Sequence, residues 1–235
     1  MKIWKTIKRN RKILIRFTKD LWNKDYFRFS KKSTDSFHWK YRIELVQEIK
    51  KNETYNSKIH NFSKASKLIT QHIIMPGELF SFWRSIGNPN KQFQKGRTIQ
   101  NGKIIEEAGG GLCQVSGIMY HLSLISGLTI LERFNHSVDI YTEESRFCPL
   151  GTDAAIVYGY KDLRIANPHS FPIQFKLGVH GNLLKIELCS IEPIEKKALH
   201  FTITEMEGSK KVTILDANEV QVSSSNYQVM DELVS

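Results

Sequence analysis

The chain has 235 residues, 40% of them hydrophobic and 25% charged, which is enough to bury one large core or one domain with an appendage. Its formal net charge of +10 is unevenly placed, because residues 1–51 hold 16 Lys or Arg against 5 Asp or Glu and the rest is close to neutral. The sequence lacks internal repeats, a signal peptide and the run of about 20 apolar residues that a membrane-spanning helix needs. We therefore expect neither a repeat protein nor a transmembrane protein, and we expect a cytoplasmic location.

Residues 1–29 are predicted to form a basic amphipathic helix. Apolar residues at near-helical spacing alternate with cationic ones: Ile3, Ile7, Leu14, Phe17 and Leu21 with Trp4 and Trp22 beside them, against Lys5, Lys8, Arg9, Arg11, Lys12, Arg16 and Lys19. Such a helix suits the interface of an anionic membrane and predicts peripheral contact with the inner membrane face. The alternative is a helix that packs on the domain and leaves its basic face in water. Nucleic acid is not expected as a partner, because no motif elsewhere would specify DNA or RNA.

Two further helices are predicted before the sheet begins. A stripe of Ile43, Val46 and Ile49 predicts a helix over 41–50. A second stripe predicts a helix over 63–72, with Ser63 as its N-cap and Pro76-Gly77 closing the segment.

The most informative segment sets a cysteine where a glycine turn opens into a helix: Gly109-Gly110-Gly111-Leu112-Cys113-Gln114-Val115-Ser116. Unpaired N–H groups at a helix start favour a thiolate over a thiol, and glycines without Cβ atoms allow a substrate backbone to approach. Apolar residues at helical spacing continue the helix to Ser126, where Gly127 ends it. The alternative is an inert buried cysteine behind an ordinary tight turn.

A histidine follows this helix in a position to serve as a base. After the apolar run 128–131, residues 133–141 alternate as a strand would, and a strand returning along the helix brings His136 toward Cys113. His121 lies eight positions along the helix, on the order of 12 Å from the thiol, and is too far away to act as the base.

A third group would orient the histidine ring, and the candidates are Asp139, Asp153, Asp162 and Asn135. Asp153 is the preferred one because it follows the turn residues Gly151-Thr152 and opens an expected strand over 155–160, although it is equally suited to capping a turn. The backbone N–H of Cys113 or of Gln114, with the side-chain amide of Gln114, is the expected oxyanion donor. Arg133 and Arg164 are expected partners for a substrate carboxylate, although an arginine beside a strand more often forms a surface ion pair.

Metal chemistry is not expected, and no cofactor is predicted. The three cysteines, Cys113, Cys148 and Cys189, are widely separated, and no pair of histidines has ligand spacing. Without a secretory signal all three are expected to be reduced.

The region after the helix is predicted to be mainly β-structure. Beyond 155–160, strands are expected at 163–166, 173–179, 183–188, 198–205 and 212–215, with hairpin turns at 180–182 and 207–209. The segment from Asn218 to Ser235 is polar and is expected to be loose at its end.

Together these blocks resemble the VanW family, known from glycopeptide-resistance gene clusters and Gram-positive cell-envelope proteins. The resemblance runs from about Met75 to about Ile173 and is carried mainly by residues 76–81, 109–116, 132–137 and 151–154, with Asn167 and Pro172-Ile173. Some members are implicated as peptidoglycan L,D-transpeptidases, which implies Cys113 as the nucleophile and His136 as the histidine of the His-Ser block. Gly110, Gly111, Gln114, Ser137 and Arg133 are then expected at the oxyanion and substrate-binding positions. Residues 142–150 are longer than the family's usual short proline turn.

The sequence therefore predicts an α+β fold in which N-terminal helices and one central helix carrying Cys113 pack on a mainly antiparallel sheet. The expected organisation is a basic helical region over 1–55, the VanW-type domain over 56–220 and a tail over 221–235. The expected function is Cys/His-dependent acyl transfer on a peptidoglycan stem peptide or its precursor. Two alternatives stay open: a non-catalytic accessory that binds a stem peptide, and a membrane-surface adaptor.

Overall fold

The structure is a computed structural model that describes residues 2–100, 103–139, 146 and 148–229. Helices and strands are interspersed up to residue 125, strands make up the described regular structure after it, and the sheets are mainly antiparallel, which confirms the predicted α+β class. The helical elements are α1 (Lys2–Trp22), the short 3-10 helix η1 (Asp25–Arg28), α2 (Tyr55–Ile69), α3 (Phe82–Ile86), α4 (Pro89–Gln92) and α5 (Leu112–Ile125). The strands are β1 (Tyr41–Glu48), β2 (Ile73–Ile74), β3 (Leu79–Ser81), β4 (Lys95–Gln100), β5 (Lys103–Ala108), β6 (Thr129–Glu132), β7 (Val138–Asp139), β8 (Arg164–Ala166), β9 (Ile173–His180), β10 (Leu183–Ser190), β11 (His200–Met206), β12 (Ser209–Leu215) and β13 (Gln221–Val229).

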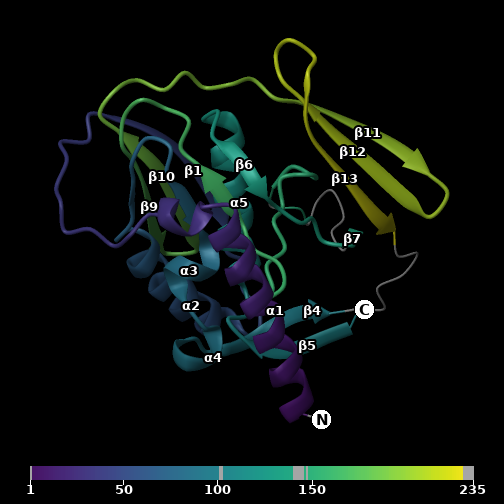
Figure 1. Cartoon of the computed structure of the whole chain (residues 1–235). Coiled ribbons are helices and arrows are strands. Elements are labelled where there is room, and N and C mark those ends of the chain that lie inside the picture. The colour runs from purple at the N-terminus through teal and green to yellow at the C-terminus, as the bar shows by residue number, and fades with distance from the viewer. Residues whose placement is uncertain (1, 101–102, 140–145, 147, 230–235) are drawn as a thin grey trace.

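The strands form three sheets and one separate hairpin. The strand orders are β1-β10-β9-β2, β3-β8-β6 and β11-β12-β13-β7, and β4 pairs with β5. Among the described strands every pairing is antiparallel except that of β13 with β7. Figure 1 shows β11, β12 and β13 standing to one side of the main body, with β7 at their foot and α1 running along the body.

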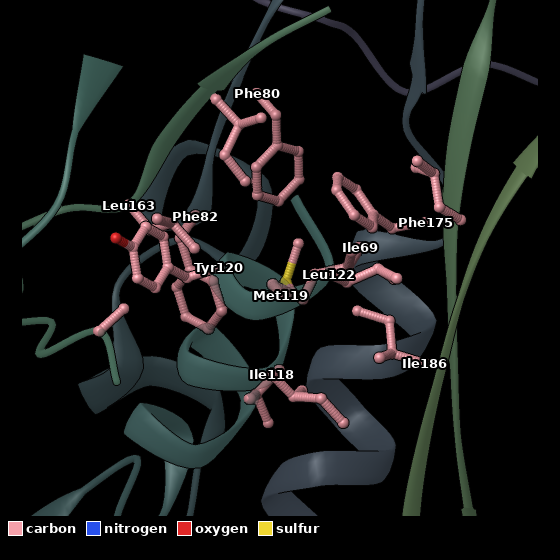
Figure 2. Close-up of a cluster of buried hydrophobic side chains, with 14 of the residues drawn as sticks. Ile69, Phe80, Phe82, Ile118, Met119, Tyr120, Leu122, Leu163, Phe175 and Ile186 are labelled. Carbon is pink, nitrogen blue, oxygen red and sulfur yellow. The ribbon is translucent and has the colours of Figure 1, made fainter. Parts of the chain in front are cut away.

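The core forms where α2 and α5 pack against each other and against one sheet, α2 on β9 and α5 on β1 and β10. Helix α5 is apolar on nearly all sides, which is the pattern of a fully buried helix. Figure 2 shows the cluster around it, in which Ile118, Met119 and Leu122 of α5 meet side chains of the neighbouring elements. This buried helix fixes the position of Cys113 at its first turn.

The predicted helix over 41–50 is wrong, because these residues form strand β1. It pairs with β10 from Tyr41 opposite Ser190 to Glu48 opposite Leu183. Ile43 and Ile49 are both buried and lie six positions apart, a spacing that fits an alternating strand as well as a helix. The residues between them separate the two patterns, because Val46 is exposed while Leu45 is half-buried and Gln47 is buried, as strand alternation requires.

The expected strand over 155–160 is also wrong. The segment is a loop closed by an isolated bridge between Val157 and Lys161, with Gly159 at a positive φ of 85°. Of the expected strand over 133–141 only Val138–Asp139 is formed, as β7, and residues 140 and 141 lie outside the described part. The amide of His136 donates to the side chain of Asp153 instead of to a neighbouring strand.

Other boundaries shift more modestly. The helix expected over 63–72 is α2, which begins earlier, at Tyr55, without a side-chain cap. Residues 221–229, expected within a loose tail, form β13, whose burial alternates and places Ser225 and Tyr227 inside. The strands expected from 163 onward and both hairpin turns are confirmed, as is the end of α5 before Gly127.

Candidate active site

The three glycines before α5 set the position of its first turn. Gly109 and Gly111 adopt positive φ angles of 86° and 90°, which L side chains rarely adopt. Gly110 packs directly on the backbone of Gly96, where a Cβ atom would lie only 2.3 Å from the Gly96 carbonyl carbon. Asn61 ties this contact to α2, because its amide donates to the carbonyl oxygens of Gly110 and Gln94, at 3.0 Å each. Gly110 and Gly111 therefore act in the structure by shaping the turn.

Cys113 lies half-buried in the first turn of α5, with its Sγ 4.0 Å from the carbonyl oxygen of Ile156. Ser116, one turn further on, donates to the carbonyl oxygen of Ala154 at 2.6 Å and so holds this loop against the helix. The amides of Leu112 and Gln114 donate to carbonyl oxygens of the glycine turn. Among the described residues the amide of Cys113 has no hydrogen-bond acceptor, which leaves it available for an oxyanion.

His136 is held by Asp153. The ring Nδ1 lies 2.5 Å from Asp153 Oδ2, and the backbone amide of His136 donates to the same oxygen at 2.7 Å. Both bonds fix the ring and leave Nε2 directed away from the carboxylate, the arrangement found in nucleophile–base–carboxylate triads. The side chain of His136 is 40% exposed, so the ring is also open to solvent.

The other candidates for the orienting group have different partners. Asp139 pairs with Arg146 at 2.8 Å. Asp162 accepts hydrogen bonds from Ser81 and from the amide of Trp83. Asn135 donates to the carbonyl oxygen of Asn226.

Charges and hydrogen bonds within the cluster shift the pKa values of Cys113, His136 and Asp153. Burial opposes the charged form of His136, but its hydrogen bonds with Asp153 and Cys113 outweigh burial and raise its pKa to about 10. Burial would likewise raise the pKa of the Cys113 thiol, but the hydrogen bond and positive charge of His136 lower it. For Asp153 the hydrogen bond and charge of His136, with the charge of Arg133, overcome burial and lower the pKa to about 2. The cluster therefore favours a thiolate–imidazolium pair.

Arg133 supports Asp153 and is not free for a substrate. Its side chain is only 7% exposed. The guanidinium donates to Asp153 Oδ1 at 2.9 Å and to three further acceptors, namely the carbonyl oxygens of Asp153 and Gly151 and the hydroxyl of Ser225. It also stacks over the ring of Tyr120, 4.7 Å from the ring centroid.

Gln114 and Ser137 take different places around the cluster. The Gln114 amide donates to the carbonyl oxygen of Glu48 at 2.8 Å, so it ties α5 to β1. Ser137 lines an open depression of about 400 Å³, and its carbonyl oxygen accepts from the amide of Gln228. The depression is lined by Phe134, Asn135, Ser137, Lys161, Ser209, Asn226, Tyr227 and Gln228.

The sequence analysis missed two residues of the site, both on β13. The hydroxyl of Tyr227 donates a short hydrogen bond to Asp153 Oδ1, and the hydroxyl of Ser225 accepts from Arg133 at 2.5 Å. The sequence signal for a strand here is weak, because only Tyr227 and Val229 stand at alternate positions and the serine run over 223–225 precedes them.

The described residues hold no group of three or more His, Cys, Asp or Glu side chains arranged to bind a metal ion. The cysteines are free, and burial raises the pKa of Cys148 to about 11. Within the described part of the chain, none of the helices is both long and apolar enough to cross a membrane.

Fold and site together define an α+β domain with a Cys-His-Asp cluster at the start of its central helix. The family model described as "VanW like protein" matches residues 57–189. This match covers more than half of the chain, which therefore belongs to the VanW family.

Two curated relatives are similar to the chain. It is 32% identical over 148 residues to "Uncharacterized protein YoaR" of Bacillus subtilis, covering 62% of this chain and 47% of the relative. It is 36% identical over 113 residues to "Vancomycin B-type resistance protein VanW" of Enterococcus faecalis, covering 47% of this chain and 41% of the relative. The matches thus span less than half the length of either relative. No solved structure is a significant match.

Proposed function

We propose that the protein is an acyl transferase that uses Cys113 as its nucleophile and acts on peptidoglycan-type stem peptides. The single observation that carries the proposal is the pairing of His136 with Asp153, because the positive charge of the paired His136 lowers the pKa of the Cys113 thiol. The name of the Enterococcus relative, a vancomycin resistance protein, supports a substrate in the cell envelope.

The reaction has two steps. The Cys113 thiolate attacks a peptide carbonyl carbon, the amide of Cys113 stabilises the oxyanion, and the carbon–nitrogen bond breaks as His136 gives its proton to the leaving amine. The enzyme then holds the donor as a thioester. An acceptor amine or water attacks this thioester, loses its proton to His136 and releases the thiolate. For a stem-peptide donor the leaving amine is a terminal D-residue.

The proposed substrate-binding surface is the depression lined by Asn135 and Ser137, the chain neighbours of His136; His136 and Cys113 do not themselves line it. Tyr227 also lines the depression and reaches Asp153 with its hydroxyl. Lys161 supplies a cationic group there that can pair with the carboxylate of a peptide terminus. Arg133, which the sequence had suggested for this role, is already occupied by Asp153.

The direct test is mass spectrometry of the full chain after incubation with stem-peptide muropeptides. We expect a mass increase equal to the donor acyl group, located on Cys113 and removed by hydroxylamine, together with release of the terminal D-residue.

The Cys113→Ala variant should form no adduct, and Cys148→Ser should react as the wild type does. If Cys113 is alkylated readily but neither adduct nor released residue forms with any muropeptide, the site is not a transferase for this substrate. Binding of the same muropeptides without turnover would then favour the non-catalytic accessory.

A further inference from the structure

Helix α1 attaches to the domain by its polar face. Arg9, Ile13, Arg16 and Asp20 share one side of the helix and are the less exposed residues along it. Arg16 binds both oxygens of Glu132 at 2.9 and 2.6 Å, and Asp20 binds Arg164 at 2.6 and 3.0 Å. These ion pairs turn the polar side of α1 inward, the reverse of an ordinary amphipathic helix on a domain surface.

The opposite side of α1 is apolar and faces solvent. Trp4, Ile7, Leu14 and Leu21 share this side, and Trp22 extends it at the end of the helix. Trp4 is 62% exposed, Leu14 is 61% exposed and Trp22 is 89% exposed. A contiguous apolar face of this kind on a surface marks a place where something binds.

The apolar face is bordered by cations. Lys8, Lys12 and Lys19 lie on one flank at helical spacing, Arg11 lies within the face, and all four are exposed. The single acidic residue of α1, Asp20, is buried in its ion pair with Arg164. The free surface of the helix is therefore apolar and positively charged.

We propose that α1 docks on the surface of an anionic lipid bilayer, lying in the interface with its tryptophans and leucines inserted and its lysines among the headgroups. Burial of apolar area and electrostatic attraction both contribute to the free energy of such membrane binding. Each basic residue near an anionic surface strengthens the binding. A second copy of the chain is the poorer fit, because pairing two α1 faces places basic flank against basic flank. The proposal is independent of the proposed transferase activity.

The test is sedimentation of the full chain with vesicles of phosphatidylcholine alone and of equal parts phosphatidylcholine and phosphatidylglycerol. We expect binding to the anionic vesicles that weakens as salt rises, with little binding to the neutral ones. The triple variant Trp4→Ser, Leu14→Ser, Trp22→Ser should reduce this binding by about tenfold or more. Circular dichroism and an unchanged alkylation rate at Cys113 should show that the variant is folded.

The matched control replaces exposed apolar residues away from α1, as Val46→Ser, Ile203→Ser, Val220→Ser, and should bind as the wild type does. Absence of binding to anionic vesicles, or equal binding by the α1 variant, would overturn the proposal. Concentration-dependent dimers lost in the α1 variant, or retention on nucleic acid without retention on vesicles, would overturn it in favour of those partners.

Discussion

At the scale of single residues, Asp153 organises the site. It accepts from the ring and amide of His136, from Arg133 and from Tyr227. The sequence predicted Cys113, His136 and Asp153 because each stands beside a local signal, a glycine turn or an extended segment. Tyr227 and Ser225 could not be predicted in this way, because they lie 74 and 92 positions from the residues they bind.

Replacing Tyr227 by Phe tests the support from β13. The change removes one hydrogen bond to a charged carboxylate while keeping the ring, and it should lower the free energy of unfolding by about 1.5–3 kcal/mol at neutral pH. It should also slow alkylation of Cys113, because His136 is held less firmly. Urea unfolding and the alkylation rate measure the two effects. Tyr160→Phe, at an exposed position, is the control, and equal effects from both variants would contradict a specific role for Tyr227.

At the scale of elements, the sequence predicted the helices and strands whose apolar spacing fits only one type of secondary structure. Helix α5 and the hairpin of β9 and β10 agree with their patterns. Strand β1 was mistaken for a helix because Ile43 and Ile49 fit both periods. The loop over 155–160 was mistaken for a strand because its residues are apolar, but it packs on helices: the carbonyl oxygen of Ile156 faces Cys113 of α5, and Gly159 lies against Arg9 and Ile13 of α1.

The glycine contact before α5 gives a prediction at this scale. Gly110→Ala places a Cβ atom on the Gly96 backbone, which cannot move aside as a flexible side chain would. We expect a loss of about 1–3 kcal/mol in the free energy of unfolding and slower alkylation of Cys113, because the start of α5 must shift. Urea unfolding measures the loss.

Gly117→Ala in the same helix is the matched control, since its Cβ would meet the nearest atom at an ordinary 3.6 Å. It should be neutral or stabilising by about 0.5–1 kcal/mol. If Gly110→Ala is equally well tolerated, the close packing of Gly110 on Gly96 does not set the position of α5.

At the scale of the whole molecule, the third sheet completes a site that begins in the family domain. The family match ends at residue 189, yet β13 provides Tyr227 and Ser225 and helps to wall the depression. On another side, α1 binds Glu132, the neighbour of Arg133 in the chain. Such long-range assembly depends on tertiary packing, which local patterns do not encode.

The charge on Asp153 predicts how stability depends on pH. Its pKa falls from 3.8 to about 2 on folding, so the carboxylate stabilises the folded chain above pH 3.8, and this contribution is lost as pH falls through 2. At neutral pH the wild type should therefore have a larger free energy of unfolding than Asp153→Asn. The difference between the two proteins should become smaller below pH 4. Urea unfolding of both proteins across this pH range measures the difference. A difference that grows as the pH falls would contradict a stabilising role for the ionised Asp153.

The most direct test of the account is the pH dependence of iodoacetamide labelling at each cysteine. We expect Cys113 to react well below pH 9, because His136 lowers its pKa, while Cys148, with a pKa of about 11, and the buried Cys189 stay unlabelled. His136→Ala should shift the labelling of Cys113 to higher pH, because burial then raises the pKa of the thiol without the opposing charge of His136. Equal labelling of all three cysteines at every pH, or a profile for Cys113 that His136→Ala leaves unchanged, would contradict an activated nucleophile.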